Sequence, residues 1–117
     1  MPRALLETTQ FKKDKKRIKN SGRYDWEKMR EIVAKLMNDL PLEVKYRDHA
    51  LTAEYAGVRE CHISPDWLLI YDAIGDVEAG ELKLIRTGSH SELFRWFVGV
   101  RYNATPWRKQ KNPLKNS

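Results

Sequence analysis

The sequence predicts an α+β fold in which an N-terminal strand and a helical hairpin pack on an antiparallel sheet. Residues 10–40 carry apolar side chains at helical spacing in two stretches separated by Gly22. Three apolar stretches with turn residues between them follow from residue 58, as in consecutive antiparallel hairpins. A length of 117 residues is that of one ordinary domain. The expected order of elements is strand, helix, helix, three strands and a final helix (β-α-α-β-β-β-α).

The N-terminal elements are a short strand and two helices. Residues 4–8 form an apolar run, and Thr8 and Thr9 are candidate N-caps for a helix over residues 10–20 that ends at Gly22. Asp25 caps a second helix, whose apolar positions step by three and four until Pro41 ends it. We expect this second helix to face the core.

The sequence pattern in the second half of the chain predicts the antiparallel sheet. Residues 41–57 keep no period and indicate an ordered loop, with a short extended piece near residues 50–53. Strands are expected over residues 58–63, 67–73 and 81–87, and the middle one, WLLIY, is apolar on both faces. Ser89 and Glu92 form a capping box that begins a short helix. We expect a folded domain over residues 1–98 and a basic tail containing aromatic residues over residues 99–117.

The charge distribution favours a polyanionic partner. The chain carries 22 Lys and Arg against 16 Asp and Glu, a net charge of +6. Residues 1–30 carry +6, residues 31–80 carry −6 and residues 81–117 carry +6. In the first helix, four lysines are candidate contacts to RNA phosphates: Lys12, Lys13, Lys15 and Lys16. The alternative is a solvated helix face.

Composition also limits the class of protein. The longest apolar run has five residues, too few to span a bilayer, and residues 1–10 lack the pattern of an export signal, so we expect a cytoplasmic protein without membrane contact. The single cysteine, Cys61, cannot form an internal disulfide. Stability must therefore come from packing.

Three histidines are candidate functional residues, because all lie at the ends of expected elements. They are His49, His62 and His90, and Asp66 lies in the turn just after His62. Glu60 is two residues from His62, which places both on the same strand face. The ordinary alternatives are surface or capping histidines, a turn aspartate, and a core position for Trp67.

Four ordered motifs resemble one family. They are RDHAL at residues 47–51, GVRECHI at 57–63, PDWLLIY at 65–71 and RTGSHSELF at 86–94. In order and spacing they resemble the YafQ-like branch of the RelE/ParE toxin superfamily, over about four-fifths of the chain. Ala53 stands where the family often has glycine, and the chain continues for more than twenty residues past Phe94.

The resemblance implies a compact RelE-like microbial RNase fold and a toxin of a type II toxin–antitoxin system that cleaves messenger RNA on the ribosome. It places His49, His62, Asp66 and His90 at catalytic positions, and Glu60, Trp67, Arg86 and Phe94 at supporting or substrate-binding ones. The implied partners are messenger RNA, ribosomal RNA and a neutralising antitoxin, whose complex with the toxin binds operator DNA through the antitoxin. No cofactor is expected, since the 2′-hydroxyl of RNA can act as the nucleophile. We favour His49 as base and His90 as acid.

The residues alone leave two other functional classes of protein open. A toxin of the same superfamily that poisons a protein such as gyrase without catalysis would not need three histidines at one rim. A metal-dependent hydrolase using the same histidines and Asp66 ranks lowest, because no close ligand pair such as H-E-x-x-H is present.

Overall fold

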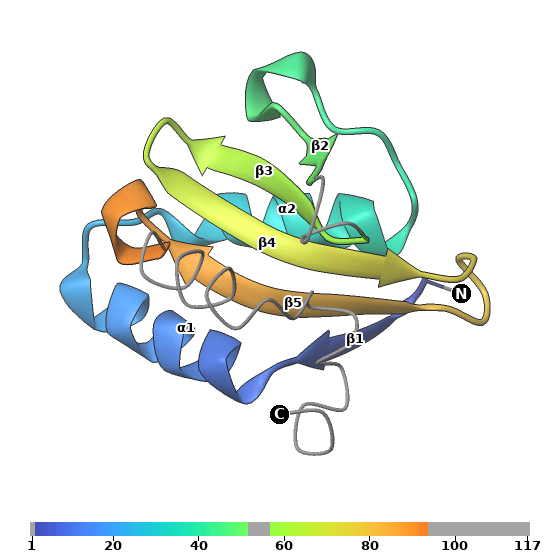
Figure 1. Ribbon diagram of the computed structural model, residues 1–117, viewed down its shortest axis with the longest axis horizontal. Helices are drawn as coiled ribbons and strands as arrows, with labels where there is room; N and C mark the ends of the chain where they lie inside the picture. Colours follow the sequence, from blue (N-terminus) through green and yellow to red (C-terminus); the bar gives the residue numbers. More distant parts are fainter. Residues whose placement is uncertain (1, 52–56, 94–117) are drawn as a thin grey trace.

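One five-stranded sheet organises the computed structural model, which describes residues 2–51 and 57–93 (Figure 1). The strand order is β1-β5-β4-β3-β2. The elements are β1 (Ala4–Glu7), α1 (Thr9–Ser21), α2 (Trp26–Met37), the 3-10 helix η1 (Val44–Tyr46), β2 (His49–Ala50), β3 (Arg59–Ser64), β4 (Trp67–Ile74) and β5 (Glu81–Gly88). Residues 90–93 begin a helical turn. The predicted α+β class is confirmed, and β2 is the short extended piece expected in the loop.

The sheet is mixed because of β1. Strands β3 to β5 pair antiparallel, as predicted, and β2 adds to β3 in the same sense. Strand β1 instead lies parallel to β5, with Ala4 opposite Glu81 and Glu7 opposite Leu84. An N-terminal strand placed beside the last strand of the sheet leaves no periodic signal in the sequence. The parallel edge is therefore a feature that only the structure shows.

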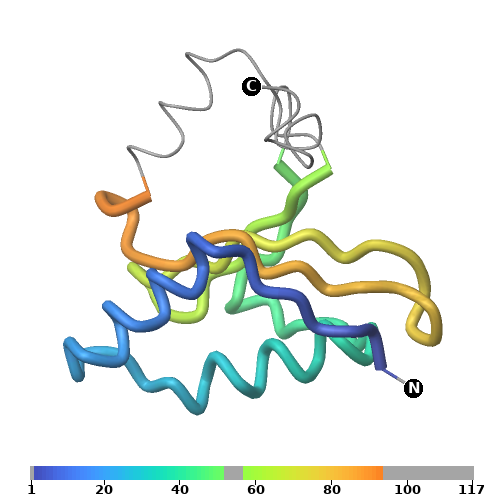
Figure 2. The backbone as a smooth tube through the Cα atoms, turned by 90° about the horizontal axis from the view of Figure 1, so that it is seen from below, coloured from blue at the N-terminus to red at the C-terminus, as the bar shows by residue number. Residues whose placement is uncertain are grey.

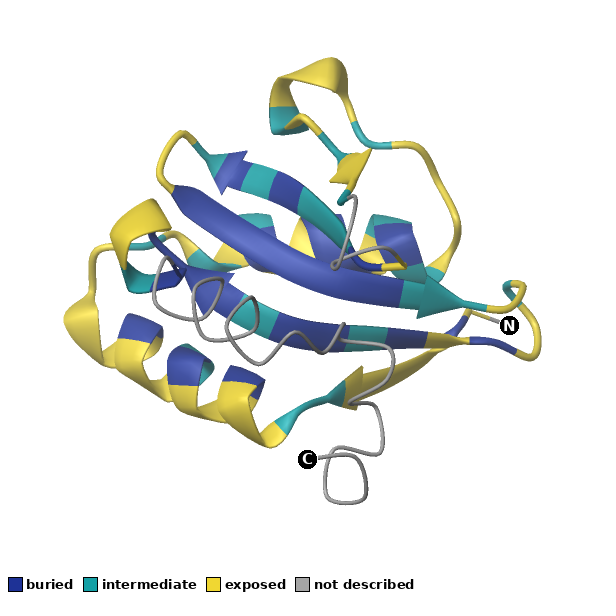
Figure 3. Cartoon of the chain, in the orientation of Figure 1, coloured by how far each residue is buried: buried dark blue, intermediate teal, exposed yellow. Residues whose placement is uncertain are grey.

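Both helices cover the same face of the sheet (Figure 2). The larger core lies between them and the sheet and contains buried residues of both helices and of β3, β4 and β5: Phe11, Ile18, Met29, Ile32, Val33, Leu36, Cys61, Ile63, Trp67, Leu69, Tyr71, Leu82 and Leu84. A smaller cluster of Val58, Leu68, Ile70, Ile85 and Leu93 lies on the opposite face. Strand β4 is buried on both faces over Trp67–Tyr71, as predicted (Figure 3). No helix in the described part of the chain is long and apolar enough to cross a membrane.

Side-chain caps set the helix ends. The Thr8 hydroxyl accepts a hydrogen bond from Phe11 N at 2.9 Å, and Gly22 ends α1 with φ at 69°. Helix α2 ends at Met37, three residues before the predicted end at Leu40. Asp39 adopts φ of 57°, so Leu40 N donates to Lys35 O at 2.8 Å and closes the last turn. The helix is thus ended by a left-handed residue ahead of Pro41.

Helix α1 contacts the part of the β5 edge that β1 does not reach. The register of β1 stops at Leu84, which leaves the backbone of residues 85–88 without a strand on that side. The Thr8 hydroxyl donates to Ile85 O at 2.8 Å. Asp14 Oδ2 accepts from Thr87 N at 3.1 Å, and Arg17 donates to Thr87 O at 3.2 Å. Side chains of the helix thereby complete the hydrogen bonding of the sheet edge.

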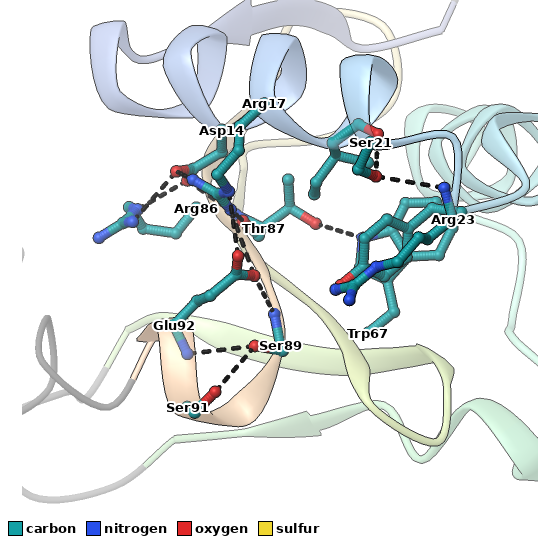
Figure 4. A network of polar contacts seen from close by, with 12 residues as sticks. Asp14, Arg17, Ser21, Arg23, Trp67, Arg86, Thr87, Ser89, Ser91 and Glu92 are labelled. Atoms are coloured by element: carbon teal, nitrogen blue, oxygen red, sulfur yellow. Dashed lines mark hydrogen bonds and ion pairs between the residues drawn. The ribbon is translucent and has the colours of Figure 1, made fainter.

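Asp14 is the centre of this contact. Its side chain is fully buried, and it accepts hydrogen bonds from Arg86 at 2.7 and 3.1 Å and from Arg17 at 2.8 Å (Figure 4). Burial alone would raise the pKa of Asp14, but the hydrogen bonds from Arg86, Arg17 and Thr87 outweigh it, so the pKa lies below its ordinary value. Asp14 is therefore a buried anion held by two cations.

We expect Asp14→Asn to lower the free energy of unfolding by about 3 kcal/mol at pH 7, because two half-buried cations lose their charge partner. The folded-state pKa is depressed, so this contribution is present above the unfolded pKa and is lost as pH falls through the folded pKa. Chemical denaturation of both proteins between pH 7 and pH 2.5 measures the difference. The matched control is Glu27→Gln, which breaks the exposed Arg30–Glu27 pair and should change stability by under about 0.5 kcal/mol. Equal effects of the two substitutions would contradict the role of Asp14.

Candidate active site

The three histidines form a row at one end of the sheet. His49 lies in β2, His62 in β3 and His90 in the turn after β5, and the ring centroids are 6.5 Å apart for His49–His62 and 5.5 Å apart for His62–His90. Because Cys61 and Ile63 point to the helices, His62 points to the opposite face, which the alternation of β3 predicted. The predicted gathering of these histidines is confirmed.

Glu60 lies between His49 and His62. The same carboxylate oxygen is 3.2 Å from His49 Nε2 and 3.8 Å from His62 Nε2, since the register of β2 and β3 places His49 opposite Glu60. His49 Nδ1 is 2.6 Å from the carbonyl oxygen of Arg47, which can only accept, so Nδ1 carries a proton. In a neutral ring, Nε2 is therefore the unprotonated nitrogen, and it lies beside the Glu60 carboxylate.

Asp66 holds His90 in the same manner. One carboxylate oxygen accepts from the backbone N–H of His90 at 2.9 Å and contacts Nδ1 of the ring at 2.5 Å. These hydrogen bonds from His90 lower the pKa of Asp66. In His62, by contrast, burial lowers the pKa of the ring, which keeps the central histidine neutral near pH 7. The row therefore has a carboxylate-paired histidine on either side of a neutral one.

The capping box predicted at Ser89 positions the turn that carries His90. Ser89 Oγ accepts from Glu92 N at 3.1 Å, and Glu92 Oε1 accepts from Ser89 N at 2.8 Å. Arg17 Nε lies 3.1 Å from Glu92 Oε2, so helix α1 is bound to this turn (Figure 4). A Cβ at Gly88 would lie 2.8 Å from the Glu92 carboxylate, so a larger residue there would displace it. The position of His90 thus depends on the edge contact described above.

Trp67 occupies the core position that was its ordinary alternative. Its ring is 1% exposed on the helix side of the sheet, where it packs on Tyr24 at 4.8 Å between centroids, so of the two implied roles the buried ring fits the supporting one. Its Nε1 donates to the Thr87 hydroxyl at 2.8 Å. Leu68 pairs with His62 and shares its face, so the alternation along β4 places Trp67 on the face opposite the histidines. Trp67 thus supports the site through the sheet.

The other predicted residues fall in three groups. Arg86 is bound to Asp14, and its contact to RNA remains a prediction. Lys12, Lys13 and Lys16 are exposed on α1, while Lys15 pairs with Glu7 at 3.2 Å. Phe94 and the predicted tail, residues 99–117, lie outside the described residues.

A cluster that the sequence did not reveal holds His49 in place. Asp48, the residue before His49, accepts hydrogen bonds from Arg59 at 3.1 Å and from the Tyr71 hydroxyl. Arg59 Nε also donates to the Tyr71 oxygen at 3.3 Å, and burial raises the pKa of Tyr71. These contacts anchor the two-residue strand β2 to β3 and β4. The only signal was an acid beside a candidate histidine, which is too common to interpret.

Within residues 2–51 and 57–93, no three side chains of His, Cys, Asp or Glu come together in a way that could hold a metal ion. The histidine row instead alternates rings with single carboxylates. That arrangement is suited to proton transfer, because each outer ring has a carboxylate that orients it.

Comparisons with known proteins agree on one family. Residues 3–95 match the model of the family described as the bacterial toxin of type II toxin–antitoxin systems, YafQ. The mRNA interferase toxin YafQ of Escherichia coli strain B / BL21-DE3 is 37% identical over 86 residues, which are 73% of this chain and 88% of that protein. The structure is similar to the E. coli DinJ-YafQ toxin-antitoxin complex (TM-score 0.69, 34% identity, 80% of this chain and 99% of that chain). It is also similar to a metal-bound toxin from Helicobacter pylori (TM-score 0.67, 37% identity, 80% and 99%).

We expect Tyr71→Phe to leave the sheet folded but to loosen β2, because Asp48 loses one of its two side-chain donors. The free energy of unfolding should fall by about 1 to 2 kcal/mol. Ring signals of His49 in NMR spectra should shift, and those of His90 should not. The control is Tyr24→Phe, which removes a hydroxyl bonded only to the exposed Arg23 side chain. An unchanged His49 signal in Tyr71→Phe would show that the cluster does not position this histidine.

Proposed function

The chain belongs to the YafQ family of toxins from type II toxin–antitoxin systems, whose curated relatives are mRNA interferases, and from this premise we propose that it cleaves messenger RNA on the ribosome through the row of His49, His62 and His90. The observation that carries the proposal is the row itself, in which a neutral histidine lies between two histidines oriented by Glu60 and Asp66. Such an arrangement can accept one proton and donate another across a single phosphate.

The proposed reaction uses the 2′-hydroxyl of the RNA as its nucleophile. His49 takes the proton from this hydroxyl, and the oxygen attacks the adjacent phosphorus. The bond from phosphorus to the 5′ oxygen of the next nucleotide breaks, and His90 gives that oxygen a proton. The products are a 2′,3′-cyclic phosphate and a 5′-hydroxyl, so protons and charge balance without a cofactor.

The remaining histidine, His62, has an electrostatic role in the proposed reaction. His62 lies between the other two rings, at the position where the equatorial oxygens of the phosphorane would carry the developing charge. A neutral imidazole there can donate one hydrogen bond without competing for the transferred protons. Glu60 and Asp66 act through the histidines they contact and are positioning residues.

A toxin of this class has an antitoxin as its partner, and the E. coli relative has been solved in complex with DinJ. Beyond that partner, we propose that this chain acts in the cytoplasm on ribosome-bound messenger RNA. The antitoxin complex is proposed to contact operator DNA through the antitoxin. The exposed lysines of α1 and the net charge of +6 support binding to ribosomal RNA phosphates.

We expect His49→Ala and His90→Ala to remain folded and to lose at least about 10²-fold in cleavage rate, since general acid and base catalysis each contribute about 10² to 10⁴. The measurement is cleavage of one transcript with and without translating ribosomes, with mapping of the new 5′ ends. Neither side chain belongs to the core clusters, so thermal unfolding should change little. Full activity of both variants, or equal rates with and without ribosomes, would contradict the proposal.

A sulfur substitution separates the two roles. When sulfur replaces the departing 5′ oxygen of the scissile bond, the leaving group no longer needs protonation. Such a substrate should restore the rate of His90→Ala and leave His49→Ala inactive. Rescue of His49→Ala would reverse the assignment of acid and base.

We expect replacement of Lys12, Lys13, Lys15 and Lys16 by Gln to weaken ribosome binding and to flatten its dependence on salt, because fewer counterions are released. Folding should be retained, since Gln is nearly as good a helix former as Lys. The measurement is affinity at two salt concentrations, for the ribosome and for the antitoxin separately. A loss confined to the antitoxin would make α1 the docking surface of that protein, and no loss for either would make it a solvated face.

A further inference from the structure

A basic cavity adjoins the histidine row at the end of β3. It has a volume of about 400 Å³ and lies between the first turns of α2, the helix η1 and the end of β3. Its lining residues are Lys28, Lys45, Tyr46, Arg47, His62, Ile63, Ser64 and Pro65. The volume falls within the range of small-ligand pockets.

The cavity gathers cations without neutralising them. Its lining holds Lys28, Lys45 and Arg47 and no carboxylate. In the described part of the chain, the side chains of Lys28 and Arg47 have no ion-pair or hydrogen-bond partner. Lys45 has an exposed contact of 3.7 Å to Glu43, and its ammonium lies 5.2 Å from the centroid of the Tyr46 ring. Residues 31–80 carry four basic groups against ten acidic ones, and two of those four line this cavity. Such a local excess of positive charge favours an anionic ligand.

Two residues connect the cavity to the proposed chemistry. His62 belongs to both, since its ring is in the histidine row and the residue is among those that line the cavity. Arg47 lines the cavity while its carbonyl oxygen accepts from His49 Nδ1 at 2.6 Å. Arg47 adopts φ of 50°, a left-handed conformation that a non-glycine residue rarely takes. The shared residues therefore place the cavity next to the histidine row.

We propose that this cavity is the subsite for the messenger nucleotide next to the scissile phosphate, with Lys28 and Arg47 binding its phosphate and Tyr46 providing an apolar wall for its sugar and base. The inference rests on the proposed function and adds to it the residues that hold the strand in register. Lys28 comes from α2 and Arg47 from the loop before β2, so two separate elements would hold one phosphate.

The test uses ribosomes carrying a messenger whose scissile 2′-hydroxyl is replaced by hydrogen, so that binding is measured without cleavage. A series of such messengers carries one neutral methylphosphonate at each phosphate flanking the mapped cleavage site. On the fully charged messenger, Lys28→Gln and Arg47→Gln should each weaken binding about tenfold. On the messenger neutralised at the contacted phosphate, the same substitutions should change binding by less than twofold, because the partner charge is already absent.

The control is Lys35→Gln, which lies on α2 two turns beyond Lys28 and lines none of the cavity. It should leave both affinities unchanged. Equal losses on every messenger of the series would assign the two cations to ribosomal RNA and overturn the subsite, as would no loss on any messenger. Either result leaves the proposed function standing, since that depends on the cleavage measurements with His49→Ala and His90→Ala.

Discussion

The buried carboxylate of Asp14 joins the helical layer to the end of the sheet that carries the histidines. Strand β1 is too short to pair with all of β5, and the exposed backbone beyond it would cost free energy if it were buried without hydrogen bonds. Asp14 meets that need at Thr87 N and at the same time neutralises Arg86 and Arg17. Arg17 then reaches Glu92, so the turn that presents His90 is fixed by the same contacts that fix the edge of the sheet. The stability of the fold and the geometry of the site share one origin.

The three histidines of the site come from different kinds of element. His62 projects from a strand inside the sheet, while His49 and His90 come from a two-residue strand and a helical turn at either side of it. The outer rings depend on local contacts to Glu60, Arg47 and Asp66 for their orientation. Each of the three rings is thus positioned by a different set of contacts, and the row depends on all of them.

Local patterns predicted much of this arrangement. The caps at Thr8 and Ser89 and the shared face of Glu60 and His62 follow from spacing of one to three residues, where side-chain geometry is decided within the chain itself. Pairing of β1 with β5 and burial of Asp14 could not be predicted, since a lone acid among lysines is typical of a solvated helix. The sequence left the role of Trp67 open between a core position and the substrate, because β4 is apolar on both faces and its alternation does not show which face carries the site. The cavity at Arg47 was missed because its walls come from separate elements whose approach leaves no local pattern.

The parallel pairing of β1 with β5 has a consequence for biosynthesis. The Thr8 hydroxyl donates to the carbonyl of Ile85, a residue 77 positions later. Strand β1 can therefore join the sheet only after β5 has been synthesised. Contacts of such high sequence separation place folding among the slower single-domain topologies. During translation, a nascent chain that still lacks its last strand has neither the edge contact of Asp14 nor the turn that carries His90. The ribosome that makes this protein therefore releases most of the chain before a complete histidine row exists beside it.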